Sequence, residues 1–296
     1  MQVRSKLDRC KSTQVIVRRH LVSSFGLRLS QGFKARGQLC VGIDPSLEQL
    51  QSWDLPKSAE GAKSFAMAIL DAAADQVGIV KTQVAFFEQF GAEGFRVLAD
   101  VLQEASSRKL MVIADAKRGD IGSTMNGYAN AWLGNEAVFL CDALTVSPYL
   151  GPESLNQVVQ VALENKRGLF ILAATSNPEA SALQSAISDG RSIAKSVYDY
   201  ASTYTAGELG SIGIVYGATV DHLSLGIDLA KPSSVPVLVP GFGSQGASLS
   251  KAKSLMQAFS PVSICSVSRA VAGSTREGLA ARVATAKDEL EVGLRG

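Results

Sequence analysis

Short apolar runs alternate with amphipathic stretches over most of the chain. The run 39–43, for example, carries no polar side chain other than the thiol of Cys40, which is typical of a strand buried on both faces. Runs of this kind predict strands over residues 39–43, 77–80, 110–114, 143–146, 168–174, 212–215, 235–239 and 262–267. Apolar residues at three- and four-residue spacing between them predict helices over residues 58–74, 92–107, 124–133, 152–165, 190–209 and 276–290.

Strands that alternate with helices form a parallel sheet with right-handed crossovers, and eight such strands close a (β/α)8 barrel. An open, doubly wound sheet is the alternative. We favour a TIM barrel in a single domain over residues 25–296, because polar residues follow the C-terminal ends of the strands, where barrel enzymes place their catalytic groups. These residues are Asp44, Lys81, Asp115, Lys117, Ser176, Gln245 and Arg269.

The N-terminal residues 1–24 differ from the rest of the chain, because they hold many Lys and Arg residues against a single acid, Asp8. We expect a disordered extension, or a start codon placed too far upstream; an organelle transit peptide is the alternative. Beyond it, Phe25, Leu29 and Phe33 recur every four residues. This spacing predicts a short amphipathic helix that could cap one end of the barrel.

Composition narrows the function further. A net charge of +2 without a long basic run in the body gives no nucleic-acid footprint, and no apolar run approaches 18 residues, which excludes a spanning helix. The cysteines have no CxxC spacing, and Cys40, Cys141 and Cys265 lie in or beside apolar runs. We therefore expect reduced, buried thiols in a cytoplasmic protein. With only His20 and His222, a histidine base or a multi-histidine metal site is nearly ruled out.

The richest chemistry lies at the end of the third predicted strand. Asp115, Lys117, Arg118 and Asp120 follow its apolar run within six residues. Asp115 and Lys117 are two residues apart, so they project to the same side if the strand continues. Carboxylates can share a dry pocket with an ammonium only when they are paired, and such a lysine is a strong electrostatic group and a possible proton donor. The alternative is a solvated cluster in a strand-to-helix turn.

A glycine-rich loop over residues 241–246 follows the seventh predicted strand. It matches the GxGxxG pattern of dinucleotide sites, but no acid lies about 20 residues further on to bind a ribose. A loop whose amides face a phosphate fits better, because the loops after strands seven and eight form the usual phosphate site of barrels. Arg269, after the eighth strand, would supply a guanidinium. A mobile surface loop beside a surface arginine is the alternative.

These motifs together resemble the orotidine 5′-phosphate decarboxylase family. The segment from Asp115 to Thr124 reads D-x-K-x-x-D-I-x-x-T behind a Val-Ile strand end, which matches the signature of that family at every position. The flanking segments 42–45, 80–88, 175–178, 240–245 and 268–269 fall in the family order and look most like its longer bacterial branch. The resemblance covers roughly residues 25–290 and implies that orotidine 5′-monophosphate is converted to UMP in de novo pyrimidine biosynthesis.

The resemblance also implies roles for individual residues. Asp44 and Lys81 would hold the ribose hydroxyls, Asp115 would face the substrate carboxylate, and Lys117 would protonate C6 of the pyrimidine. Asp120 and Thr124 would reach into the site of a second subunit, so that a homodimer shares its active sites. Ser176 would bind the pyrimidine edge, and Gln245, Ser268 and Arg269 would belong to the substrate site, with Gln245 and Arg269 on the phosphate. No cofactor and no metal ion are implied.

Three other functions stay open. A related phosphosugar decarboxylase of the ketogulonate-phosphate type would use Mg2+ at the same strand end, although the residues at positions 176 and 245 speak against it. An aldolase could form a Schiff base on Lys81 or Lys117. A barrel that binds a phosphate ligand without catalysis is disfavoured, because every charged position of the motif is present.

Overall fold

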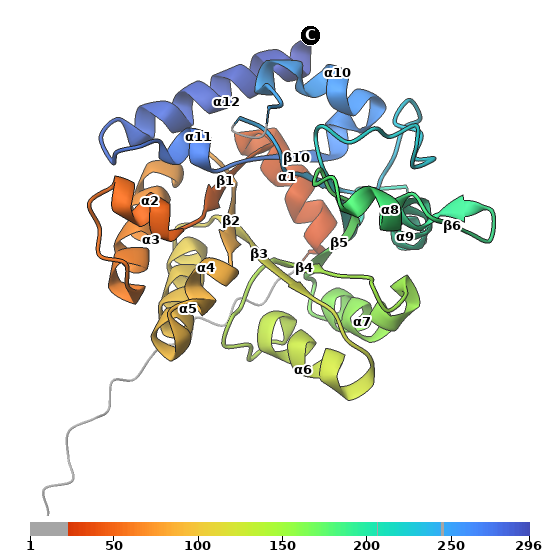
Figure 1. Ribbon diagram of the computed structural model, residues 1–296, viewed down its shortest axis with the longest axis horizontal. Helices are drawn as coiled ribbons and strands as arrows, with labels where there is room; N and C mark the ends of the chain where they lie inside the picture. Colours follow the sequence, from red (N-terminus) through yellow and green to blue (C-terminus); the bar gives the residue numbers. More distant parts are fainter. Residues whose placement is uncertain (1–22, 206, 244–245) are drawn as a thin grey trace, which may run out of the picture.

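The structure is a computed structural model, and it describes residues 23–205, 207–243 and 246–296. Eight parallel strands close into a barrel in the order β1-β10-β9-β8-β5-β4-β3-β2, and helices surround it (Figure 1). The strands are β1 (Leu39–Ile43), β2 (Ile79–Gln83), β3 (Met111–Arg118), β4 (Ala143–Val146), β5 (Gly168–Ala174), β8 (Ile212–Tyr216), β9 (Val237–Val239) and β10 (Ser263–Val267). The predicted barrel is confirmed, and the open sheet is excluded.

The helices fill the connections between the strands. The longer ones are α1 (Phe25–Arg36), α3 (Ala59–Ala73), α5 (Gly91–Ser107), α6 (Gly122–Leu133), α7 (Asn156–Glu164), α9 (Ile193–Ser202) and α12 (Leu279–Arg295). The shorter ones are α2 (Leu47–Ser52), α4 (Ala85–Glu88), α8 (Ala180–Gln184), α10 (Ala252–Met256) and α11 (Arg269–Ala272), with 3-10 turns at Pro152–Leu155, Leu249–Lys251 and Gln257–Val262. The short helices were not predicted, because one turn or so is too short to show a helical period.

The segment between β5 and β8 departs most from the prediction. A single helix was expected over residues 190–209, but a small antiparallel hairpin, β6 (Ile187–Ser188) with β7 (Arg191–Ser192), comes first. Helix α9 then starts at Ile193, where the hydroxyl of Ser192 accepts a hydrogen bond from the N–H of Lys195. Asp189 and Gly190 both have positive φ angles in the turn, which the hydrophobic spacing does not reveal.

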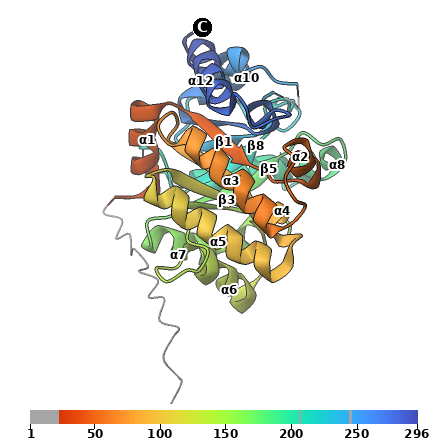
Figure 2. The same cartoon turned by 90° about the vertical axis from the view of Figure 1, so that its left-hand side faces the viewer.

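Helix α1 closes the N-terminal end of the barrel. Its Phe25 and Leu29 pack with one inward-facing residue from each strand, and the ring of Phe25 meets that of Phe170 edge-on. The predicted capping helix is therefore confirmed. Figure 2 shows α1 at one end of the barrel and α2 and α8 at the other. Residues 1–22 of the predicted N-terminal extension lie outside the described residues. Ser24, at its end, caps α1 by accepting a hydrogen bond from the N–H of Leu27.

The remaining core lies between the strands and the surrounding helices. Cys40, Cys141 and Cys265 are free and buried there or in the barrel interior, as predicted. Burial raises the pKa of each of these thiols to about 12, so they are protonated and poor nucleophiles at neutral pH. Among the described residues, no helix has the length and apolar character needed to cross a bilayer.

Candidate active site

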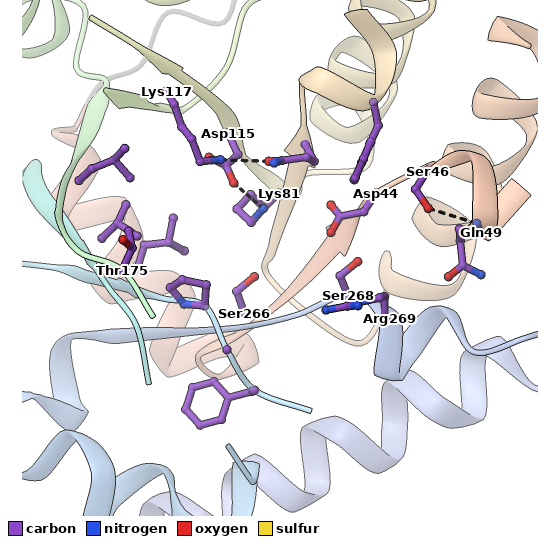
Figure 3. A pocket seen from close by; sticks show the side chains of 18 of the residues that line it. Asp44, Ser46, Gln49, Lys81, Asp115, Lys117, Thr175, Ser266, Ser268 and Arg269 are labelled. Atoms are coloured by element: carbon purple, nitrogen blue, oxygen red, sulfur yellow. Dashed lines mark hydrogen bonds and ion pairs between the residues drawn. The ribbon is translucent and has the colours of Figure 1, made fainter. Parts of the chain in front are cut away.

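A cavity of about 740 Å³ opens at the C-terminal end of the barrel. Leu172, Val215 and Leu238 give it an apolar side, and charged groups from other strands face them. Five of the predicted charged residues line this cavity: Asp44, Lys81, Asp115, Lys117 and Arg269 (Figure 3). The cavity therefore combines a surface for a flat apolar group with a compact set of charges.

Asp115 is the centre of the charged group. Its Oδ2 lies 2.9 Å from the Nζ of Lys81 and its Oδ1 lies 2.7 Å from the Nζ of Lys117. Burial would raise the pKa of Asp115, but the two ammonium groups hold it well below its usual range. For Lys81, burial would lower the pKa, but the carboxylates of Asp115 and Asp44 raise it instead. Asp115 and Lys81 are therefore both charged at neutral pH.

Strand β3 continues past the predicted end and carries both members of the motif. Asp115 and Lys117 do project to the same side and meet, as the two-residue spacing predicted. The strand is irregular there, because its register with β4 shifts between Ala114 and Arg118 and the φ angle of Lys117 is +49°. The guanidinium of Arg118 pairs with Glu88 on α4, which anchors the end of the strand. The first two charges of the cluster therefore lie on a strand and around a shielded carboxylate, whereas Asp120 lies in the loop that follows.

Asp44 lies beside Lys81 at the end of the neighbouring strand β1. Its Oδ1 is buried and has no hydrogen-bond partner among the described residues. A buried carboxylate oxygen without a partner is costly, and it is well placed to accept a hydrogen bond from a ligand in the cavity. A Cβ at Gly42 would lie 2.6 Å from the Cβ of Ser268, so glycine lets the end of β10 approach β1 this closely.

Arg269 reaches the cavity from the end of β10, where it begins α11 behind Ser268. In Figure 3, Arg269 and Lys117 lie at opposite ends of the labelled charged residues. The N–H groups of Gly243 and Gly246 donate to carbonyls of their own loop, at 2.8 and 3.0 Å. The expectation that the loop amides face a phosphate is therefore wrong for these two, and Arg269 is the described group best placed to bind an anion.

Comparison with known proteins gives a consistent result. A family model described as orotidine 5′-phosphate decarboxylase / HUMPS family matches residues 37–284. The orotidine 5′-phosphate decarboxylase of Corynebacterium glutamicum (strain R) is 43% identical over 259 residues, which is 84% of this chain and 90% of the relative. That of Streptomyces coelicolor is 47% identical over 229 residues, or 75% and 80%. The chain belongs to the orotidine 5′-phosphate decarboxylase family.

Solved structures of decarboxylases have the same fold as this chain. A candidate orotidine 5′-phosphate decarboxylase from Streptomyces avermitilis matches with a TM-score of 0.86 at 39% identity, over 93% of this chain and 97% of that one. The Leishmania donovani OMP decarboxylase matches with a TM-score of 0.72 at 27% identity, over 92% and 99%. The barrel found here is thus shared with these proteins over nearly its whole length.

Three of the residues expected from the family resemblance lie outside the cavity. Asp120 uses its Oδ1 to accept a hydrogen bond from the N–H of Ile121, and Thr124 is exposed on α6. Ser176 is exposed after β5, while its neighbour Thr175 lines the cavity. Gln245 lies outside the described residues. The residues that the resemblance implies are therefore divided between groups that line the cavity and groups that do not.

Sequence reasoning missed two residues that contact the charged group. The Oε1 of Gln83 lies 3.4 Å from the Nζ of Lys117, and Gln83 shares a face of β2 with Lys81, so the two-residue spacing could have found it. Thr145 donates a hydrogen bond to Asp115 from within β4. Its position in an apolar run did not indicate a functional role, because threonine is common in strands, where its branched side chain packs well.

Proposed function

We infer that this protein decarboxylates orotidine 5′-monophosphate to UMP, the reaction of de novo pyrimidine biosynthesis. The observation that carries this function is the pairing of one shielded carboxylate, Asp115, with both Lys81 and Lys117 at the C-terminal end of the barrel. Loss of CO2 from C6 leaves a carbanion in the plane of the ring, which no adjacent carbonyl delocalises well. A fixed ammonium beside that carbon stabilises the charge without a cofactor.

Lys117 is the residue that we place at the reacting carbon. Its side chain is 43% exposed, whereas that of Lys81 is 9% exposed, so Lys117 has the better access to the cavity. After CO2 leaves, the Lys117 ammonium transfers a proton to C6 and becomes a neutral amine. Asp115 lies within hydrogen-bond distance of this ammonium. It would also face the substrate carboxylate, and repulsion between the two negative charges would destabilise the bound substrate relative to the transition state.

The other end of the substrate fits the other end of the cavity. The unpartnered Oδ1 of Asp44 and the ammonium of Lys81 would bind the ribose hydroxyls. Arg269 would bind the 5′-phosphate, with Ser268 beside it and Gln245 from the adjacent loop. Because the phosphate is far from C6, its binding energy can be used to close the loop and assemble the site. Ser176 follows Thr175, which lines the cavity, and it would contact the pyrimidine edge once the site has closed.

We also propose that the active form is a homodimer with shared sites. Asp120 and Thr124 do not face their own cavity. Ile121, Tyr149 and Leu150 are exposed apolar residues that follow the neighbouring strands β3 and β4, and exposed apolar residues of this size often mark an interface. A two-fold partner that covered them would receive Asp120 and Thr124 in its own site. The free thiols support a cytoplasmic location.

The direct test is to mix the purified chain with orotidine 5′-monophosphate and EDTA and follow the ultraviolet change as UMP forms. We expect full turnover, because the described residues supply the charges without a metal ion. Activity that EDTA abolishes and Mg2+ restores would instead favour the phosphosugar decarboxylase. Trapping of a substrate by borohydride would favour the Schiff-base aldolase, and tight binding of UMP without turnover would favour a non-catalytic barrel.

A further inference from the structure

Thr145 links the two central residues of the site through a single hydroxyl. It lies on β4 and is fully buried, between the apolar residues Leu144 and Val146. Its Oγ1 accepts a hydrogen bond from the main-chain N–H of Lys117 at 2.9 Å, and it donates one to the Oδ1 of Asp115, also at 2.9 Å. The same Oδ1 binds the Nζ of Lys117, so the three groups form a closed ring of hydrogen bonds.

The irregularity of β3 explains why such a link is needed. Ala114 pairs with Leu144 and Arg118 pairs with Val146, so residues 115–117 of β3 lie opposite Thr145 alone. A bulge of this kind interrupts the ladder and leaves main-chain groups without their usual partners. The hydroxyl of Thr145 supplies the missing acceptor for the N–H of Lys117, whose φ angle of +49° is unfavourable for a lysine.

We propose that Thr145 is a positioning residue for the decarboxylation inferred above, and this proposal rests on that function. Thr145 is absent from the described residues that line the cavity, so it acts through Asp115 and Lys117. Its hydroxyl fixes the carboxylate plane of one and the main chain of the other. The ammonium of Lys117 is thereby held where the carbanion forms, before the substrate arrives, and preorganisation of this kind lowers the barrier of the chemical step.

The test compares three variants of the full chain. Thr145→Val removes the hydroxyl and keeps the branched shape, while Thr145→Ser keeps the hydroxyl and removes the methyl group. Thr82→Val is the matched control, because Thr82 is equally buried on β2, the strand on the other side of β3, and its Oγ1 has no hydrogen-bond partner among the described residues. If Thr145→Val does not fold, Thr145→Cys, whose thiol is a weak donor, takes its place.

We expect Thr145→Val to lower kcat by roughly 10- to 100-fold, because a small misplacement of reacting groups costs about this much. Its KM and its affinity for UMP should stay within about threefold of the wild type, since the groups that bind ribose and phosphate are untouched. Thr145→Ser should keep kcat within about threefold, and Thr82→Val should keep it unchanged. An unchanged kcat in Thr145→Val, equal losses in the Val and Ser variants, or an equal loss in Thr82→Val would overturn the proposal.

Amide hydrogen exchange of the segment 111–120 separates this proposal from the proposed function. Exchange there should be faster in Thr145→Val than in the wild type and unchanged in Thr82→Val, whether or not the protein turns over orotidine 5′-monophosphate. An inactive wild type with this exchange pattern would refute the decarboxylase and leave Thr145 as the residue that positions Lys117. An active wild type in which neither exchange nor kcat responds to Thr145→Val would refute the positioning role alone.

Discussion

Asp115 at the C-terminal end of β3 and Asp142 just before β4 lie at opposite ends of the barrel, and each is held between two cationic side chains. The two carboxylate side chains are only 13% and 4% exposed, yet the cations that face them differ. Lysines surround Asp115, and arginines surround Asp142. The lysine site opens into the large cavity, whereas the arginine site is covered by α1. A carboxylate between two cations thus occurs once beside an open cavity and once beneath a helix.

The arginine site joins helix α1 to the N-terminal end of the barrel. The guanidinium of Arg28 on α1 lies 2.9 Å from Asp142 and also donates to the carbonyls of Ser23 and Lys166. Arg167 approaches the same carboxylate at 3.6 Å. A guanidinium is planar, presents several donors in a fixed geometry and does not release a proton in proteins. Such a group is suited to fastening a helix across the end of a barrel.

The lysine site is open to the cavity on one side. An ammonium is a compact charge that can rotate and can give up a proton to a substrate. The side chain of Lys117 is 43% exposed, compared with 16% for Arg28. Burial and pairing alone therefore do not identify an active site; the identity of the cation and its access to a cavity do. Each of the following predictions tests one side of this comparison.

The largest effect is expected at Lys117. Lys117→Ala should lower kcat by about 10⁴-fold or more while the variant still binds UMP, because a group that acts mainly in the transition state affects kcat. Lys117→Arg replaces the ammonium with a guanidinium, the kind of cation that pairs with Asp142 at the other end of the barrel. It keeps the charge beside Asp115 but cannot donate the proton, so it should be nearly as inactive. If either variant keeps more than roughly a tenth of the wild-type kcat in a steady-state assay, the proton-donor role is wrong.

The second prediction concerns which chain supplies the residues that cover each end of the barrel. The N-terminal end is closed by α1 of the same chain, whereas the proposed site at the other end takes Asp120 from a second copy. Lys117→Ala and Asp120→Ala dimers should each be nearly inactive. When subunits exchange at random, half of the dimers are mixed and one of their two sites is intact, so activity should return to roughly a quarter of the wild type. Demonstrated exchange without recovered activity would show that Asp120 serves its own barrel.

The third prediction concerns Arg269, the arginine that does face the cavity. Its guanidinium should bind the substrate phosphate instead of a carboxylate of the chain. Arg269→Ala should lower kcat/KM for orotidine 5′-monophosphate by roughly 10- to 100-fold, the loss expected for a charged hydrogen bond. Orotidine without a phosphate should be turned over by the variant as well as by the wild type, because it has nothing for Arg269 to bind. Equal damage to both substrates would mean that Arg269 is structural.

The same comparison explains what the sequence could predict. Buried parallel strands are apolar runs, so the eight strands could be found, and the two-residue spacing correctly joined Asp115 to Lys117. The ion pair between Arg28 and Asp142 could not be found, because the residues are 114 positions apart and no local spacing connects them. Thr145 was missed because a hydroxyl in an apolar run carries no spacing signal. Contacts between distant segments depend on the closure of the barrel, which a linear pattern does not describe.

The smallest effect on catalysis is expected at the arginine site. Asp142→Asn keeps the shape and an acceptor for the N–H of Val112, which the carboxylate binds at 3.0 Å, but removes the charge that faces Arg28 and Arg167. Breaking a buried ion pair costs about 3 kcal/mol or more. The midpoint of thermal unfolding should therefore fall by about 6–12 °C, while kcat per folded molecule stays the same.

Asp100→Asn is the matched control for this last prediction, because Asp100 pairs with Lys63 at 2.6 Å where both side chains are more than a third exposed. An exposed pair of this kind contributes at most about 1 kcal/mol, so its loss should shift the unfolding midpoint by only a few degrees. Equal shifts in the two variants would show that burial of Asp142 adds nothing to the strength of its ion pairs. A fall in kcat of folded Asp142→Asn would show that the two ends of the barrel are coupled, and the division between a structural end and a chemical end would then fail.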